Sequence, residues 1–172
     1  GWLLVTLVDS DGDNVGNQYI TVGIADDEPV ANDDANSLGE DDASVVPGNV
    51  LTGASSGDVA DSAGADVDGG IVVTTIDSSA EAEKAVNAGG VDIDGTYGTL
   101  NIKADGTYTY TLTADLNDLD DGETREDVFT YGVKDGDGVG VDTADLKITI
   151  NGENDPPTAA ADPAGEAGAS EV

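Results

Sequence analysis

Carboxylates are the side chains of this chain that could do chemistry, and little in the composition balances them. The 172 residues include 37 Asp and Glu but only 5 Lys and Arg, with no His and no Cys, so the net charge is −32. Many acids stand in or beside expected turns, as in Asp135-Gly136-Asp137. Hard oxygen donors that converge from loops suit calcium, which takes six to eight oxygens in flexible geometry. Calcium is therefore the cofactor that these residue types predict.

The same composition excludes several classes of function. Without Cys or His, the chain has no disulfide, no zinc–thiolate site and no Cys or His nucleophile. No basic face can be built, so neither nucleic acid nor an anionic membrane surface is an expected partner. No run of about 18 apolar residues occurs, so direct membrane insertion is not expected. Paired carboxylates could hydrolyse glycosides, but nothing singles out an acid and a nucleophile among them, and we expect no enzyme.

Short strands are the elements that must position these acids. Apolar and polar residues alternate through residues 100–102 and 108–112, and Asp105-Gly106 between them is typical of a hairpin turn. Abundant Thr, 24 glycines and the lack of a 3.6-residue period predict an all-β antiparallel sandwich. Tyr108, Tyr110 and Tyr131 are expected in its core rather than on a sugar-stacking surface. The other expected inward or strand residues are Val72, Thr74, Ile76, Phe129, Val133, Leu146, Ile148 and Ile150.

Some segments lack a strand pattern. Residues 53–70 are small and acidic, which predicts a loop. Residues 78–88 contain Val86 as their only large apolar side chain, so we expect a loop with at most one helical turn. Asp92-Ile93-Asp94 is expected in a loop, and residues 159–172 are expected to be a disordered tail.

An internal repeat sets the domain organisation. Asp11-Gly12-Asp13 matches Asp135-Gly136-Asp137 at an offset of 124 residues, and in both places an alternating strand and an acidic, proline-bearing stretch follow. We therefore predict three parts: the C-terminal hairpin and linker of a preceding repeat (1–28), a complete sandwich repeat (29–154), and a disordered linker with the start of the next repeat (155–172). The absence of an initiator Met and of a signal peptide fits a piece excised from a longer chain.

The complete unit resembles a known family of bacterial repeats. The motifs that carry the resemblance are Gly-Thr-Tyr-Gly-Thr-Leu at 95–100, Ala-Asp-Gly-Thr-Tyr-Thr-Tyr at 104–110, residues 127–138 and the closing Ile-Thr-Ile-Asn-Gly-Glu-Asn-Asp-Pro-Pro at 148–157. Together they are similar to the cadherin-like, immunoglobulin-like tandem repeats of giant bacterial adhesins exported by type I secretion, including VCBS repeats and RTX adhesins.

The resemblance implies a fold and a function. The fold would be an immunoglobulin-like (cadherin-like) Greek-key antiparallel β-sandwich. The function would be that of an extender repeat, stiffened by calcium at its junctions, in a secreted adhesin on the surface of a Gram-negative bacterium, acting in cell adhesion and biofilm. Its partners would be the neighbouring repeats of the same chain, and the adhesion target stays unknown.

The topology of such a sandwich sorts the acids into two poles. The first strand begins at the N-terminal pole, where the turn between the last two strands must meet the incoming linker. The last strand leaves at the C-terminal pole, beside the turn that precedes Phe129. The expected metal ligands are Asp26, Asp27, Asp135 and Asp137 at the N-terminal pole and Asp118, Asp120, Asn154 and Asp155 at the C-terminal pole.

Other interpretations of these acids stay open. Asp-Gly favours turns whether or not an ion binds, and a strongly acidic surface also occurs as adaptation to salt. Asp9 to Ile20 begins like an EF-hand loop, but Asn14 and Ile20 stand where Gly and Glu are required. The long stretch 53–90 supports a second hypothesis, a glycan- or peptide-binding module, although it contains no aromatic residue for stacking on a sugar.

Overall fold

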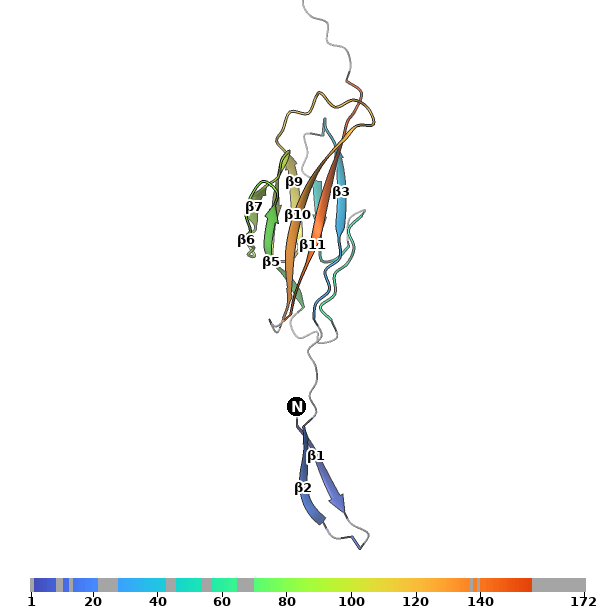
Figure 1. The fold of residues 1–172 in the computed structure, drawn as a ribbon, viewed down its shortest axis with the longest axis vertical. Helices are drawn as coiled ribbons and strands as arrows, with labels where there is room; N and C mark the ends of the chain where they lie inside the picture. The colour runs from blue at the N-terminus through green and yellow to red at the C-terminus, as the bar shows by residue number, and fades with distance from the viewer. Residues whose placement is uncertain are drawn as a thin grey trace, which may run out of the picture.

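The chain folds as an all-β protein. A computed structural model describes residues 2–8, 11–12, 14–21, 28–42, 46–53, 57–64, 70–136, 138 and 140–155. These residues form eleven strands (Figure 1), and among them no helix has the length and hydropathy needed to cross a bilayer. The strands are β1 (Trp2–Val8), β2 (Asn14–Thr21), β3 (Asp34–Gly39), β4 (Val46–Asn49), β5 (Ile71–Ser78), β6 (Lys84–Ala85), β7 (Val91–Asp94), β8 (Gly98–Ile102), β9 (Thr107–Leu112), β10 (Thr124–Asp135) and β11 (Val141–Asn151).

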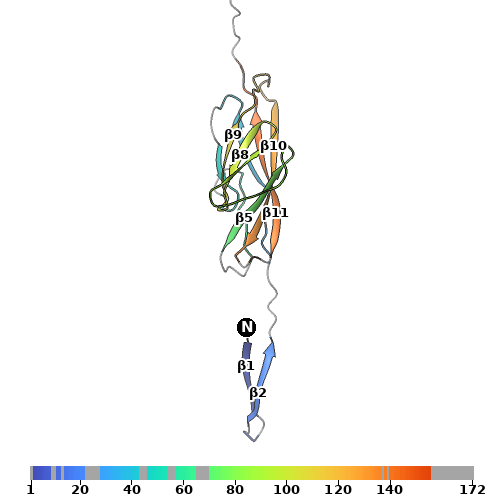
Figure 2. The ribbon, with the colours of Figure 1, turned by 90° about the vertical axis from the view of Figure 1, so that its left-hand side faces the viewer.

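Strands β3 to β11 form a sandwich of two sheets. One sheet has the order β3-β11-β10-β5-β6 and the other the order β4-β9-β8-β7. Figure 2 shows the sandwich from the side, with β8 and β9 of the second sheet beside β10 and β11 of the first. The chain passes from one sheet to the other four times, after β3, β4, β6 and β9, as in the Greek-key pattern of immunoglobulin-like sandwiches. The expected fold class is confirmed.

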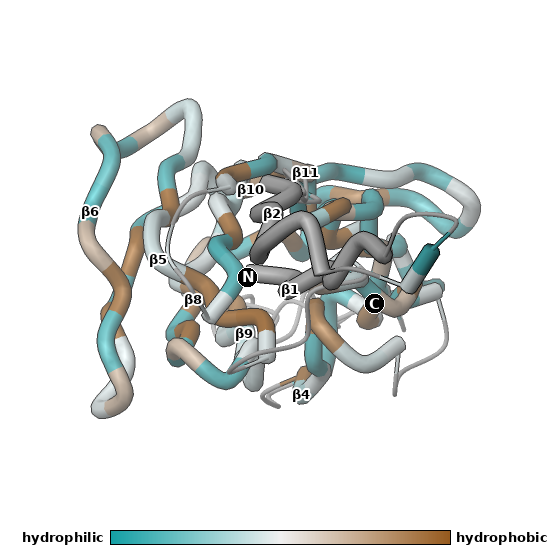
Figure 3. Tube along the Cα trace, turned by 90° about the horizontal axis from the view of Figure 1, so that it is seen from below, coloured by the Kyte–Doolittle hydropathy of each residue, from teal (hydrophilic) through white to brown (hydrophobic). Residues whose placement is uncertain are grey.

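The core lies between the sheets, and the alternation of the strands builds it (Figure 3). Tyr110, Phe129 and Tyr131 are fully buried, and the ring of Tyr110 meets Phe129 edge-on at 6.1 Å between centroids. The tyrosines are core residues, as their spacing predicts. The expected inward sets are buried at Leu100, Ile102, Tyr108, Val133, Leu146, Ile148 and Ile150.

The hairpin and strand ends agree with the local sequence signals. Gly106 has a φ of +78°, which glycine adopts without strain. Across the turn, Gly106 N donates to the backbone oxygen of Lys103, and Lys103 N donates to Thr107 O. In β5 both Val73 and Ile76 are buried, because a register irregularity opposite Gly132 and Val133 shifts the strand's face partway along. Because of that irregularity Val73 is buried and Val72 is exposed, whereas Ile76 is buried as expected.

One local prediction is wrong and one is incomplete. Residues 78–88 are mostly a loop, as expected. Residues 78–88 make no helical turn: Ser78 Oγ accepts from Ala80 N and Glu81 N, and the chain then adds the two-residue strand β6 to the edge of β5. Asp92-Ile93-Asp94 is not a loop but part of β7, which pairs with β8 and buries Ile93. In both places the edge of a neighbouring strand supplies hydrogen bonds that local composition does not reveal.

The parallel pairing of β3 with β11 sets the two poles. Leu146 pairs with Asp34 and Asn151 with Gly39, so both strands run from the N-terminal pole to the C-terminal pole (Figure 1). Strands β1 and β2 form a separate antiparallel two-stranded sheet. The division of the chain into parts of three repeats stays a prediction, and most of the expected third part, residues 156–172, lies outside the described residues.

Candidate functional site

At the N-terminal pole the β10–β11 turn packs against the incoming segment. A Cβ on Gly140 would collide with Pro29 Cδ and would lie 3.2 Å from Glu28 Cα and 3.4 Å from Asp135 Oδ2. Gly140 and Pro29 are both buried. The topological prediction is therefore confirmed: the turn between the last two strands meets the incoming chain, and the Asp135 carboxylate lies at that contact.

Of the ligands predicted at this pole, Asp135 lies among the described residues. Asp135 is 4% exposed, and its Oδ1 accepts a hydrogen bond from Gly138 N at 3.0 Å. Asp135 thus also closes the turn, as the Asp-Gly alternative expects. Asp26, Asp27 and Asp137 lie outside the described residues, so their part in a site stays a prediction.

A further acid ties the incoming segment to β11. Asp142 Oδ2 accepts from Ala31 N and its Oδ1 from Thr143 N, each at 2.9 Å. The hydrogen bond from Ala31 N, with that from Thr143 N, lowers the pKa of the Asp142 carboxyl. Nothing in the spacing of Asp142 distinguishes it from any other outward residue of a strand, so sequence reasoning missed it.

At the C-terminal pole the outgoing segment packs against the β9–β10 connection. Gly152 is buried, its N donates to Glu123 O at 2.9 Å, and a Cβ on it would collide with Asp120 O. This contact confirms the predicted meeting of turn and outgoing linker. The predicted ligands Asp118, Asp120, Asn154 and Asp155 are all exposed here, and Asp118 lines a shallow hollow with Asp115 and Asn117.

Glu40 is the carboxylate at this pole that the sequence prediction did not include. It follows β3 directly, is 8% exposed, and its Oε1 accepts from Glu153 N at 2.8 Å. Its Oε2 is the buried side-chain oxygen that has no hydrogen-bond partner among the described residues. A buried carboxylate oxygen without a partner is costly, so Glu40 Oε2 is open to a ligand that the described residues do not supply.

Two more carboxylates, those of Asp42 and Glu153, lie close to Gly39. Asp42 Oδ2 accepts from Gly39 N at 2.9 Å, and it lies 3.4 Å from the position that a Gly39 Cβ would take. Glu153 Oε1 occupies that position so closely that any side chain at residue 39 would displace it. Gly39 therefore leaves a space that carboxylate oxygens fill. Glu40, Asp42 and Glu153 together are called the C-terminal acidic cluster below.

The donor set of this cluster fits calcium. Its atoms are hard carboxylate oxygens, one of them is buried and unpartnered, and the exposed Asn154 and Asp155 follow Glu153 directly. These are the ligands that calcium takes, at about 2.3–2.6 Å. Within the described ranges no three acids are already gathered in a metal-holding arrangement. Ion binding would therefore require the cluster's side chains to turn inward.

Asp127 provides the contrast of a buried carboxylate that is fully satisfied. It is 3% exposed, and its two oxygens accept from Thr96 N, Tyr97 N, Gly98 N and Tyr110 Oη at 2.7–3.3 Å. Burial and the hydrogen bond to Asp127 raise the pKa of Tyr110, which keeps this hydroxyl protonated. Asp127 therefore holds the β7–β8 turn against β10, and it offers an ion no free oxygen.

A sequence signal for Glu40 exists but is weak alone. Glu40 ends the first strand of the sandwich and Glu153 follows the last, 113 residues later. Because β3 and β11 are parallel and paired up to Gly39 and Asn151, the acids that follow the two strands meet at the same pole. The positions of the turns alone indicate Asp118 and Asp155 but not Glu40.

The two-sheet Greek-key sandwich of β3 to β11 is the fold of cadherin-like modules. The chain belongs to the bacterial cadherin-like domain family, whose model matches residues 26–152. It is also similar to the calcium-binding lectin RapA2 of Rhizobium johnstonii, with 33% identity over 131 residues. The match covers 76% of this chain and 49% of RapA2, so the chain spans about half the length of that relative. Cadherin-like and lectin-type families are non-enzymatic binding modules, and the expectation that this chain is not an enzyme stays a prediction.

Proposed function

We propose that this chain is a calcium-stiffened extender repeat of a bacterial surface adhesin. The unpartnered Glu40 Oε2 at the C-terminal pole carries the proposal. Membership of the cadherin-like family and the calcium-binding relative support it. The finer expectations, a VCBS-type repeat of an RTX adhesin exported by type I secretion to a Gram-negative surface and acting in biofilm, belong to this proposal.

A different set of residues would hold calcium at each pole. At the C-terminal pole, Glu40, Asp42 and Glu153 would hold the ion with Asn154 and Asp155 of the outgoing linker. At the N-terminal pole, Asp135 and Asp137 would meet the linker residues Asp26 and Asp27. Calcium, when bound, supplies two positive charges that oxygens of both the sandwich and its linker can share. Sharing would fix the angle between neighbouring repeats.

The energetics favour this role. Two carboxylates about 4 Å apart repel by about 1 kcal/mol even in water, and more where they are partly desolvated. Extracellular modules bind calcium at about 0.1–1 mM, and a free concentration of 100 times Kd stabilises the folded form by about 2.7 kcal/mol. That amount is a large share of the stability of a single domain, about 5–15 kcal/mol.

Glu40→Gln tests the proposal, because its effect on the unfolding temperature should change sign when calcium is added. In chelator the variant should unfold at a higher temperature than the parent, since it removes a buried charge that has one unpartnered oxygen. In calcium it should unfold at a lower temperature, and calorimetric titration should give a roughly tenfold or greater loss of affinity, because a hydrogen bond or contact to a charged group contributes about 1.5–3 kcal/mol.

Glu126→Gln is the matched control, with the same chemical change on the outer face of β10. Glu126 is exposed, and its Oε1 lies 3.6 Å from Lys147 Nζ. This control should keep the calcium affinity of the parent. Equal affinities for Glu40→Gln and the parent would refute the assignment of Glu40.

Carbohydrate binding is the second candidate, and the lectin relative favours it. The 53–90 stretch borders an apolar hollow lined by Leu51, Thr52, Ile71, Val72, Ala88, Ala104 and Asp105, without an aromatic residue. A glycan array probed with and without calcium decides between the two. Saturable glycan binding that is abolished by Val72→Asp would favour the carbohydrate-binding function. The absence of glycan binding would favour the extender function.

A further inference from the structure

The hydroxyl of Tyr131 faces more acceptors than it can satisfy. At the N-terminal pole, Tyr131 Oη lies 2.9 Å from Asn32 O, 2.9 Å from Asp34 Oδ2 and 3.1 Å from Asp61 Oδ2. Asp34 is 3% exposed and Asp61 is half-buried. A phenol carries one proton and donates one hydrogen bond. Two of the three oxygen–oxygen contacts therefore have no proton if both carboxyls are ionised.

One additional proton would supply a second of these three contacts and would remove one of the two facing negative charges. A protonated Asp34 Oδ2 would donate to Tyr131 Oη, and the Tyr131 hydroxyl would then donate to Asp61 Oδ2 or to Asn32 O. The outer oxygens of the two carboxyls are already occupied, since Asp34 Oδ1 accepts from Val59 N at 2.6 Å and Asp61 Oδ1 from Asn32 N at 2.7 Å. Neither carboxyl can relieve the contact by simple rotation without losing a backbone hydrogen bond.

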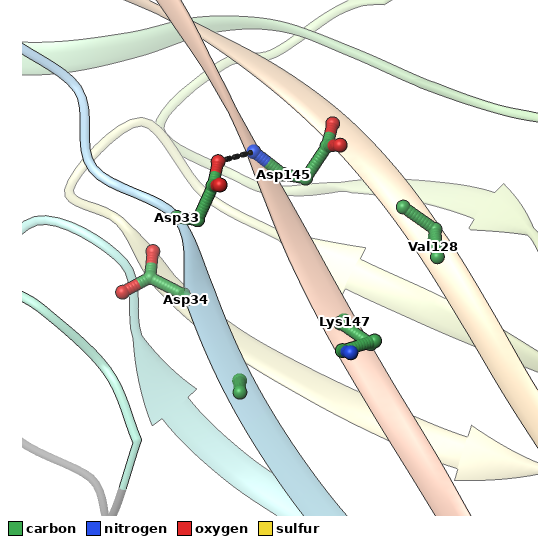
Figure 4. A pocket seen from close by; sticks show the side chains of 6 residues that line it. Asp33, Asp34, Val128, Asp145 and Lys147 are labelled. Atoms are coloured by element: carbon green, nitrogen blue, oxygen red, sulfur yellow. Dashed lines mark hydrogen bonds between the residues drawn. The ribbon is translucent and has the colours of Figure 1, made fainter.

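Among the described residues, the charged groups that face this cluster are carboxylates, and the nearby Lys147 is directed to the other side of β3. From the loop, Asp58 faces Asp34 and accepts from Tyr108 Oη of β9 at 3.1 Å, and from β11, Asp142 faces Asp61. On the far side of β3, Asp33 accepts from Asp145 N, and Lys147 lines the same groove (Figure 4). The side chains of Asp33 and Asp34 point to opposite sides of the strand, and Lys147 Nζ lies 3.6 Å from Glu126.

We propose that Asp34 and Asp61 share one proton through the Tyr131 hydroxyl, and that losing this proton loosens the 57–62 segment from the N-terminal pole. Other hydrogen bonds attach this segment to the loop after β4, to β4 and to the incoming chain, among them Asp61 N to Leu51 O, Asn49 N to Asp58 Oδ2 and the Val30–Ser62 pair. The Tyr131 contacts are the ones that join it to β10. The carboxyl contacts join three elements, β3, β10 and the loop. The presence or absence of the shared proton therefore controls how tightly residues 57–62 pack on the N-terminal pole.

The electrostatic environment agrees with the geometry. Burial raises the pKa of Asp34 to about 7, against the hydrogen bonds from Val59 and Tyr131, and the charges of Asp58 and Asp61 raise it further. Burial likewise raises the pKa of Asp61, and Asp142 adds to this. A raised folded-state pKa means that the folded chain binds the proton more tightly than the unfolded chain. The resulting stability is present below about pH 4 and is lost as the pH rises toward 7.

Asp34→Asn in chelator tests the shared proton. An asparagine amide can donate to Tyr131 Oη and its carbonyl can accept from Val59 N, so it imitates the protonated acid. At pH 8 the urea midpoint of the variant should exceed that of the parent, and this advantage should disappear by pH 5. Asp127→Asn is the matched control: its amide cannot accept the four hydrogen bonds that Asp127 accepts, so its midpoint should fall.

A loss of midpoint at pH 8 in Asp34→Asn as large as in Asp127→Asn would overturn the proposal. The second readout is the infrared carbonyl band of a protonated carboxyl in the parent at pH 6, where exposed carboxyls are ionised, and its loss in the Asp34→Asn, Asp61→Asn double variant. Absence of that band in the parent would also overturn it. Because both measurements are made without calcium, their failure leaves the proposed calcium role untouched.

Discussion

The buried carboxylates of this chain differ in what satisfies them. Asp127 accepts from three backbone N–H groups and a tyrosine hydroxyl, while Asp34 meets a hydroxyl that it must share with Asp61. Glu40 has one oxygen with a backbone donor and one without a partner. Asp135 closes a turn beside the incoming chain. A carboxylate with complete hydrogen bonding is structural, and an incompletely bonded one is open to a proton or an ion.

At the N-terminal pole the prediction concerns Asp135 and Asp137. Replacing both by asparagine removes two charges from the turn that meets the incoming linker, so it should abolish most of the calcium-induced rise in melting temperature contributed by this pole. The fold should persist, because Asn at 135 can still accept from Gly138 N. Thermal unfolding with and without calcium measures this.

The Asp92→Asn, Asp94→Asn double variant is the control for spacing and charge. These two acids have the same Asp-x-Asp spacing, but they are exposed on β7 and accept from Asn101 Nδ2 and Thr99 Oγ1. The control should retain the calcium shift of the parent. If both double variants retain it equally, the Asp135–Asp137 turn is not a ligand.

At the scale of elements, period-two alternation predicts the strands that have one buried face. Phe129, Tyr131, Leu146 and Ile148 follow it without exception because both of their strands are central in the sheet. The edge elements β6 and β7 do not follow from the sequence, since a partner strand rather than local composition makes them. Glu40 was missed for a related reason: its neighbour Glu153 reaches it only through the parallel β3–β11 pairing.

The edge of the first sheet should therefore be the least stable part of the sandwich. Strand β6 pairs with β5 through only two residue pairs, whereas β10 pairs along most of its length with both β5 and β11. In native-state hydrogen exchange, the amides of residues 79–89 should exchange at least about a hundredfold faster than those of Tyr131 and Ile148. Uniform protection across β6 and β10 would contradict this assignment of the weak edge.

At the scale of the whole molecule, the charge of −32 opposes compaction, and two ion pairs join the described residues: Lys84 with Glu81 and Lys147 with Glu126. Monovalent salt relieves such repulsion only by screening. Coordination at the poles would do more, because it acts at the ends where the sandwich meets its linkers. The strand topology brings acids to those ends from segments more than a hundred residues apart.

Thermal unfolding of the whole 172-residue chain in calcium and in chelator, at matched ionic strength, tests the central claim most directly. Saturating calcium should raise the melting temperature by on the order of 10 °C, given about 2.7 kcal/mol per site at 100 times Kd. Sodium chloride of equal ionic strength should not reproduce that rise. Identical melting temperatures in calcium and in chelator would contradict the account, and the acids would then serve only to tolerate salt.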